Sequence, residues 1–182
     1  MSKHTFKKFQ VTYHKLRPNL LENGADVAHL GFLHLPSALK WVPSLSHKWS
    51  ADWTAGEEPE GHLAYINLTQ SLQLYGHEIG LTKLESSITQ VGPALVFLSI
   101  HTRMGHYFIL QSVTPIKPTL QKVTNVIYGP RGVMYRLLAK ISLLIYCEQF
   151  ARDIVIWNNK TYKHKPVVVK GDGNILVRRR HF

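Results

Sequence analysis

The segment Glu22-Asn23-Gly24-Ala25-Asp26-Val27-Ala28-His29-Leu30-Gly31-Phe32-Leu33-His34 places two histidines five residues apart, with a carboxylate three residues before the first. Because residues three apart share a helix face, Asn23, Asp26 and His29 are expected to form one stripe. Residues five apart diverge on a straight helix, so the helix must break or bulge near Gly31 if His29 and His34 are to reach one atom. Two imidazoles and one distant carboxylate form the triad typical of non-haem Fe(II) sites. The pattern favours iron over zinc.

The candidate for the distant carboxylate is Asp153. Its helical neighbours at i−7, i−3, i+3 and i+4 are apolar or aromatic: Tyr146, Phe150, Ile156 and Trp157. A carboxylate on such a face costs free energy unless it is paired or binds a metal. The alternative is that Asp153 lies at the border of this face and pairs with a lysine or arginine in solvent, as exposed carboxylates do.

The rest of the chain predicts strands followed by a long helix. Even positions of Ala64–Tyr75 are mostly apolar and odd positions mostly polar, which is typical of a half-buried antiparallel strand. Three further strands are expected, at Ala94–Ile100, Tyr107–Val113 and Gln121–Tyr128. Glu57–Gly61 and Gly129–Gly132 are predicted turns. The order helix, strands, helix predicts an α+β fold.

From Val133 to Lys160 the spacing is helical. Arg136, Lys140, Glu148 and Arg152 recur at multiples of four, so we expect them to form one polar stripe. The apolar run Leu137–Cys147 is too short to span a bilayer, which needs about 20 residues.

Length and composition indicate one domain covering residues 1–182. The single cysteine, Cys147, excludes an internal disulfide and suggests an intracellular, reducing compartment. The net charge of +11 is spread along the chain without a nucleic-acid-binding motif. It therefore favours a basic surface facing an anionic membrane or an acidic redox partner over nucleic-acid binding. The polar, basic start of the chain is unlike a signal peptide.

Other residues that could carry chemistry have simpler interpretations. His101 and His106 repeat the five-residue spacing but have no acid beside them, so they are expected to be structural or to line a pocket. Three tryptophans are expected in the core or at its rim: Trp41, Trp49 and Trp53. Cys147, within an apolar helix, is expected to be inert.

The motifs together resemble a known family. Residues 22–34 read E-N-x-x-D-x-x-H-x-x-x-x-H, similar to the iron-binding helix of Rieske-type non-haem iron oxygenases, and ENGADVAHL is especially similar to the cholesterol 7-desaturases, the Neverland family. FARDIVIWNNK at residues 150–160, followed by Pro166 and Lys170–Gly173, resembles that family's carboxylate motif. A third match covers Gln111–Tyr128 with its Thr114-Pro115 turn.

The resemblance implies a helix-grip (START-like) fold, in which an antiparallel sheet wraps a long C-terminal helix. It implies a mononuclear Fe(2+) held by His29, His34 and Asp153. Asp26 is expected to hydrogen-bond the His29 ligand and to link it to an electron donor, with Asn23 beside it. The implied reaction is the 7,8-desaturation of cholesterol to 7-dehydrocholesterol in steroid hormone biosynthesis, using O2 and NAD(P)H.

The resemblance also implies parts that this sequence lacks. Family members carry a [2Fe–2S] cluster on C-x-H and C-x-x-H, a reductase partner, a membrane-spanning N-terminal segment and a trimeric assembly. With one cysteine the chain cannot ligate that cluster. We expect an incomplete enzyme whose electrons come from an external reductase or Rieske domain.

Two alternatives stay open at this point. A helix-grip domain can carry a sterol or other lipid in its cavity without chemistry. The same ligands can also hold zinc in a hydrolase, although the sequence has no H-E-x-x-H general base.

Overall fold

The computed structural model describes residues 9–16, 20–34, 42, 44–103, 105–117, 120–159 and 161. Its elements, in chain order, are β1 (Phe9–Leu16), α1 (Leu20–Ala25), α2 (His29–Leu33), β2 (Leu45–Ala55), β3 (Leu63–Leu74), β4 (His77–Val91), β5 (Leu95–Thr102), β6 (Gly105–Lys117), β7 (Leu120–Tyr128) and α3 (Val133–Asn159). Trp41, Pro166 and Lys170–Gly173, which entered the sequence predictions, lie outside the described residues.

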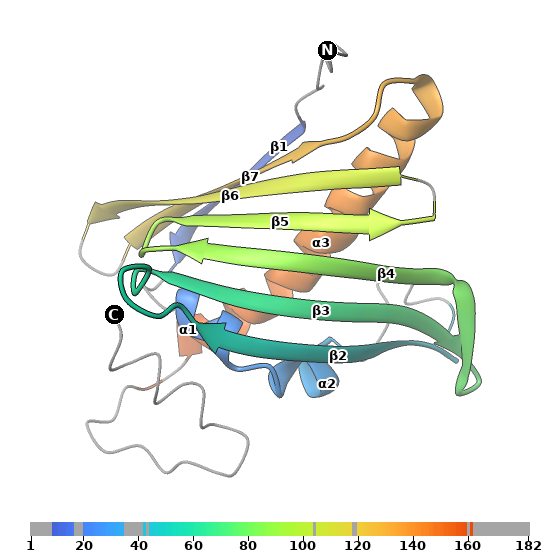
Figure 1. Cartoon of the computed structure of the whole chain (residues 1–182), viewed down its shortest axis with the longest axis horizontal. Coiled ribbons are helices and arrows are strands. Elements are labelled where there is room, and N and C mark those ends of the chain that lie inside the picture. Colours follow the sequence, from blue (N-terminus) through green and yellow to red (C-terminus); the bar gives the residue numbers. More distant parts are fainter. Residues whose placement is uncertain are drawn as a thin grey trace.

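All seven strands form one antiparallel sheet in the order β1-β7-β6-β5-β4-β3-β2. Strands β2 to β7 follow one another as a meander. Strand β1, the first of the chain, pairs with β7 at the edge of the sheet opposite β2. Figure 1 shows α3 crossing one face of this sheet, with α1 and α2 near the β2 edge. The predicted α+β architecture is therefore confirmed, except that a strand precedes the first helix.

The four predicted strands correspond to β3, β5, β6 and β7, whereas β1, β2 and β4 were not predicted. The alternation that predicted β3 does not hold along its whole length. The register shifts between Gln70 and Leu72, and at this irregularity Ser71 is buried. Leu74, which follows the original alternation, is exposed. The faces themselves still alternate, because Leu68, Gln70 and Leu72 all line the same cavity between the sheet and α3, and β3 pairs with β2 in unbroken register. The departure from the pattern is therefore in burial and not in orientation.

Helix α3 packs its inner face against one face of the sheet. Ala139, Leu143 and Cys147 join a buried cluster with strand residues such as Leu98 and Ile109. Further along the helix, Phe150 and Trp157 pack against Val113 and Val123. Burial of Cys147 agrees with its expected inert role. This packing fixes where residues 146–153 of the helix meet the sheet.

The outward face of α3 is not the polar stripe that the sequence predicted. Arg136 and Lys140 are exposed as expected, and Arg152 lies 3.9 Å from Glu148. Large apolar side chains nevertheless share this face: Val133, Met134, Leu137, Ile141 and Leu144 are all exposed. The charged residues recur every four positions, but apolar residues occupy the positions between them, so the exposed face of the helix is mixed. No helix among the described residues is both long and apolar enough to cross a bilayer.

Candidate metal centre

The helix carrying the first motif breaks at Asp26–Ala28, not near Gly31 as predicted. Helix α1 ends at Ala25, and α2 begins at His29 and continues through Gly31 to Leu33. The Asp26 carboxylate accepts the His29 backbone N–H (3.3 Å), which satisfies a free donor at the start of the new helix. Asn23 and His29 therefore lie on different helices, and the expected single stripe is wrong.

Glycine 24 lets α1 lie close against the sheet. A Cβ at Gly24 would lie 2.5 Å from Gln90 Nε2 and 3.1 Å from Ile66 Cδ1. The neighbouring Ala25 is fully buried in a cluster with Trp53 and Ile66. This close approach holds the end of α1 against β3 and β4, next to the cavity described below.

Asp153 meets both histidines in the interior. Its Oδ1 lies 3.7 Å from His29 Nε2 and 3.1 Å from His34 Nε2. Ligand atoms of the three residues all lie within 4.8 Å of one another. Two ligands at about 2.1 Å from one metal are about 3.0 Å apart at right angles and about 3.4 Å apart in a tetrahedron. With Asp153 only 5% exposed, its alternative role as a surface ion-pairing group is wrong.

Both imidazoles turn Nε2 toward Asp153 because Nδ1 is held elsewhere. His29 Nδ1 contacts the main-chain carbonyl oxygen of Asp26. His34 Nδ1 lies 2.8 Å from Gln149 Oε1. The sequence predicted that the Asp26 carboxylate would hydrogen-bond the His29 ring, but the main chain makes this contact. The reason is that α1 ends before Asp26, which frees its carbonyl group from helical hydrogen bonding.

The donors present fit a divalent metal. Among the described residues, His29 Nε2 and Asp153 Oδ1 are buried and make no hydrogen bond. Buried polar atoms without partners cost free energy, and a shared cation would satisfy both. Two imidazole nitrogens and one carboxylate oxygen are the donor set of non-haem Fe(II). The other Asp153 oxygen, Oδ2, accepts a hydrogen bond of 3.1 Å from Asn23 Nδ2.

A cavity of about 360 Å³ opens beside these residues, between the sheet and α3. Its walls are mainly apolar and include Val96, Leu98 and Ile100 of β5. His29, His34 and Asp153 line it too, so a ligand in the cavity would lie next to the metal. The volume falls within the range of small-molecule sites, roughly 300–1,000 Å³.

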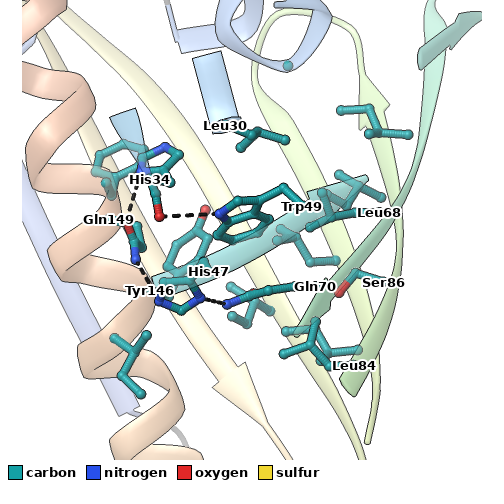
Figure 2. A pocket seen from close by; sticks show the side chains of 18 of the residues that line it. Leu30, His34, His47, Trp49, Leu68, Gln70, Leu84, Ser86, Tyr146 and Gln149 are labelled. Carbon is teal, nitrogen blue, oxygen red and sulfur yellow. Dashed lines mark hydrogen bonds between the residues drawn. The ribbon is translucent and has the colours of Figure 1, made fainter. Parts of the chain in front are cut away.

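The polar residues of the cavity that were not predicted include His47, Gln70 and Gln149, whereas Trp49 was expected in the core or at its rim. Trp49 Nε1 donates to the His34 carbonyl oxygen (3.2 Å), and its ring stacks on His47 at 5.4 Å. Burial, with the charge of Arg152, lowers the pKa of His47 to about 4. Figure 2 shows His34, Gln149, His47 and Gln70 joined in that order by dashed lines. The alternation His47-Trp49-Ala51-Trp53 was a strand signal that could have identified β2 and its cavity-facing residues.

The remaining aromatic candidates have structural roles. Trp53 belongs to the buried core, as predicted. His101 and His106 stack on each other at 4.0 Å and share Ser99 Oγ, and neither lines the cavity. This pair therefore takes the structural role that the sequence suggested.

Comparisons with known proteins agree with this arrangement. The sequence matches the family described as 3-ketosteroid 9alpha-hydroxylase C-terminal domain over residues 2–182. It is 38% identical over 172 residues to the cholesterol 7-desaturase of Xenopus laevis, covering 88% of this chain and 38% of that protein. It is 34% identical over 165 residues to the cholesterol 7-desaturase of Drosophila melanogaster, covering 85% of this chain and 37% of that protein. The chain thus spans less than two-fifths of the length of these relatives.

Among solved structures, NdmA of Pseudomonas putida with caffeine superposes with a TM-score of 0.61 at 12% identity, covering 96% of this chain and 50% of that chain. Dicamba monooxygenase bound to dicamba gives a TM-score of 0.56 at 10% identity, covering 96% of this chain and 57% of that chain. At such identities the likeness establishes the fold, which is that of oxygenase catalytic domains. The chain belongs to the family of the 3-ketosteroid 9alpha-hydroxylase C-terminal domain.

Proposed function

We propose that this chain is the catalytic domain of a sterol-oxidising, Rieske-type oxygenase that binds one Fe(II) through His29, His34 and Asp153. The observation that carries the proposal is the convergence of these three ligand atoms within 4.8 Å, beside an apolar cavity. The relatives named cholesterol 7-desaturase support a cholesterol-like sterol as the substrate.

Each ligand is held by a neighbour that fixes its orientation. The main-chain carbonyl of Asp26 and the amide of Gln149 hold the two imidazoles, and Asn23 holds the carboxylate. Such fixed ligands keep the donor atoms in place while other positions stay open to substrates. When bound, Fe(II) supplies the activation of O2 that an unactivated C–H bond requires.

The cavity would bind and orient the sterol. A sterol is a rigid and mainly apolar body, which matches walls built from Leu68, Ile88, Val96 and Leu98. These side chains would also exclude water from the reacting carbon. Desaturation removes two hydrogens from adjacent carbons: sterol, O2, NAD(P)H and H⁺ give dehydrosterol, NAD(P)⁺ and two waters.

We propose that electrons reach the site from a Rieske cluster outside these 182 residues. One cysteine cannot provide the two cysteines that such a cluster needs. Asp26 is partly exposed, its carboxylate accepts the His29 backbone N–H and its main-chain carbonyl contacts the His29 ring, so it offers a link between the surface and the ligand. The donor would sit on a neighbouring subunit of a homotrimer, and a membrane-bound sterol pool would supply the substrate.

The test supplies a reductase, NAD(P)H, iron and cholesterol and follows 7-dehydrocholesterol. The 182-residue chain alone should give no turnover. Fusing a Rieske domain to it should give turnover, which Asp26→Ala should abolish. Turnover by the chain alone would show that another electron route exists. A fused protein that binds iron and is reduced by the reductase, but never oxidises a sterol, would contradict the proposed activity.

A carrier that holds sterol without chemistry is less well supported. Such a carrier gains nothing from three buried ligand atoms, two of which lack hydrogen-bond partners among the described residues. A zinc hydrolase is not favoured either, since the sequence has no H-E-x-x-H motif.

A further inference from the structure

A line of buried polar side chains runs from His34 away from the proposed metal. His34 Nδ1 lies 2.8 Å from Gln149 Oε1, and Gln149 Nε2 lies 3.5 Å from His47 Nε2. His47 Nδ1 then contacts the side-chain amide of Gln70. The four residues come from the end of α2, from α3, from β2 and from β3, and Figure 2 shows their contacts as one chain of dashed lines.

These residues are polar groups in a mainly apolar cavity. His34 and His47 are each 3% exposed, and Gln149 is 8% exposed. Burying such groups is costly unless each donor meets an acceptor, so the order of donors and acceptors is constrained. That constraint determines where the protons lie.

The order can be worked out from the metal end. A metal on His34 Nε2 requires the proton on Nδ1, which then donates to Gln149 Oε1. The Gln149 amide nitrogen therefore faces His47 and donates to its Nε2. For His47 Nε2 to accept, this ring must be neutral, with its proton on Nδ1. The pKa of about 4 that burial gives His47 agrees with a neutral ring at pH 7.

The orientation of the Gln70 amide follows from the same requirement that each donor meets an acceptor. His47 Nδ1–H needs an acceptor, which is the amide oxygen of Gln70. An amide's oxygen and nitrogen exchange places by a half-turn, so either atom can occupy the contact position. Every bond then points the same way, from His34 to Gln70. Aligned hydrogen bonds polarise one another, which makes the far nitrogen of His34 a better electron donor.

We propose that Gln149 and His47 are positioning residues that orient the His34 ring and stabilise its metal-binding Nδ1–H form through a one-way hydrogen-bond chain ending at Gln70. The inference rests on the proposed metal site and deepens it, because it says how one ligand is kept ready for metal. Gln149 touches the ligand directly, and His47 acts through Gln149.

The first test needs no substrate and uses Zn(II), which is diamagnetic, because without a metal His34 Nε2 lies 3.1 Å from Asp153 Oδ1 and can itself carry a proton toward that oxygen. Nitrogen-15 NMR of histidine-labelled, Zn(II)-loaded protein at pH 7 reports which ring nitrogen carries the proton. The chain predicts Nδ1–H for both His34 and His47. Finding the His47 proton on Nε2 would reverse the chain and overturn the proposal. A failure of metal binding alone would instead count against the proposed function.

Variants test the roles separately. Gln149→Leu removes both the acceptor for His34 and the donor to His47, so in the Zn(II) form His47 should become a mixture of tautomers, and Co(II) or Fe(II) affinity should fall about 10–100-fold. Gln149→Glu keeps an acceptor for His34 and should retain the metal affinity. Gln111→Leu is the matched control, because Gln111 is an equally buried amide of the same cavity that bonds Asn125 and Tyr146 instead. It should leave the His47 tautomer and the metal affinity unchanged.

A different role for His47 and Gln70 would give a different result. If they only anchor a polar group of the sterol, His47→Phe would weaken sterol binding and leave the His34 spectrum and the metal affinity unchanged. That outcome would overturn the proposal. The chain predicts a several-fold loss of metal affinity in His47→Phe even without sterol.

Discussion

Asn23 donates a hydrogen bond to Asp153 Oδ2 at 3.1 Å, joining two residues that are 130 positions apart in the sequence. This contact ties the end of α1 to α3. It occupies one carboxylate oxygen and leaves the other, Oδ1, facing His29 and His34. Asp153 Oδ2 therefore orients the carboxylate through Asn23, and Asp153 Oδ1 is the candidate metal ligand.

Asn23→Ala should weaken metal binding because the Asp153 carboxylate would lose the donor that orients it. Loss of such an orienting partner typically lowers metal affinity about 10–100-fold. Anaerobic titration with Fe(II), or with Co(II) as a spectroscopic substitute, measures the change. Asn67→Ala, at an exposed position of β3, is the control and should bind like the unaltered chain. Equal affinities for both variants would show that Asn23 has no orienting role.

The buried His47 should make the metal-free fold less stable in acid. Its pKa is about 4 in the folded protein against 6.5 ordinarily, so between these values the unfolded chain binds more protons. Stability should therefore fall as the pH drops from about 6.5 to 4, with a loss on the order of 1–3 kcal/mol. Urea unfolding of the chain and of His47→Gln across this range gives the difference. A pH dependence that is identical in the two proteins would contradict the assignment to His47.

Filling the cavity should block sterols but spare the metal. Leu98 lines the cavity and is 7% exposed, whereas the adjacent Phe97 is 45% exposed on the opposite face of β5. Leu98→Trp should lower the affinity for a fluorescent cholesterol analogue at least tenfold and leave Co(II) binding intact. Phe97→Trp adds a similar side chain outside and should change neither. If Leu98→Trp still binds the sterol normally, the sterol lies elsewhere.

The sequence was sufficient for the regular parts of the fold. Unbroken alternation or sustained apolar spacing predicted β5, β6, β7 and α3 within a few residues. It was insufficient where tertiary contacts override a local pattern. The edge strand β1 pairs with the distant β7, and β4 is polar along much of its length. The irregular pairing of β3 with β4 near Gln70–Leu72, where Ser71 is buried, likewise depends on the neighbouring strand and not on local periodicity.

In the candidate site too, local motifs predicted some residues, while the roles of others depend on tertiary contacts. His29, His34 and Asp153 were identified through motifs, and their convergence agrees with that identification. The break in the helix was expected near Gly31, but it lies at Asp26–Ala28, where the Asp26 carboxylate accepts the His29 backbone N–H. Gln149 and His47 carry no motif. Their roles depend on α3 and β2 meeting across the cavity, which only the folded structure shows.

The most direct test of the metal centre measures how many Fe(II) ions each chain binds under anaerobic conditions. Calorimetry gives the stoichiometry, and thermal unfolding gives the stabilisation. We expect one ion per chain, with a stabilisation of about 2.7 kcal/mol at a free metal concentration 100 times the Kd. His34→Ala and Asp153→Ala should lose both the ion and the stabilisation. His101→Ala, at an exposed histidine outside the cavity, should retain them. Binding that survives in Asp153→Ala but is lost in His101→Ala would contradict the proposed centre.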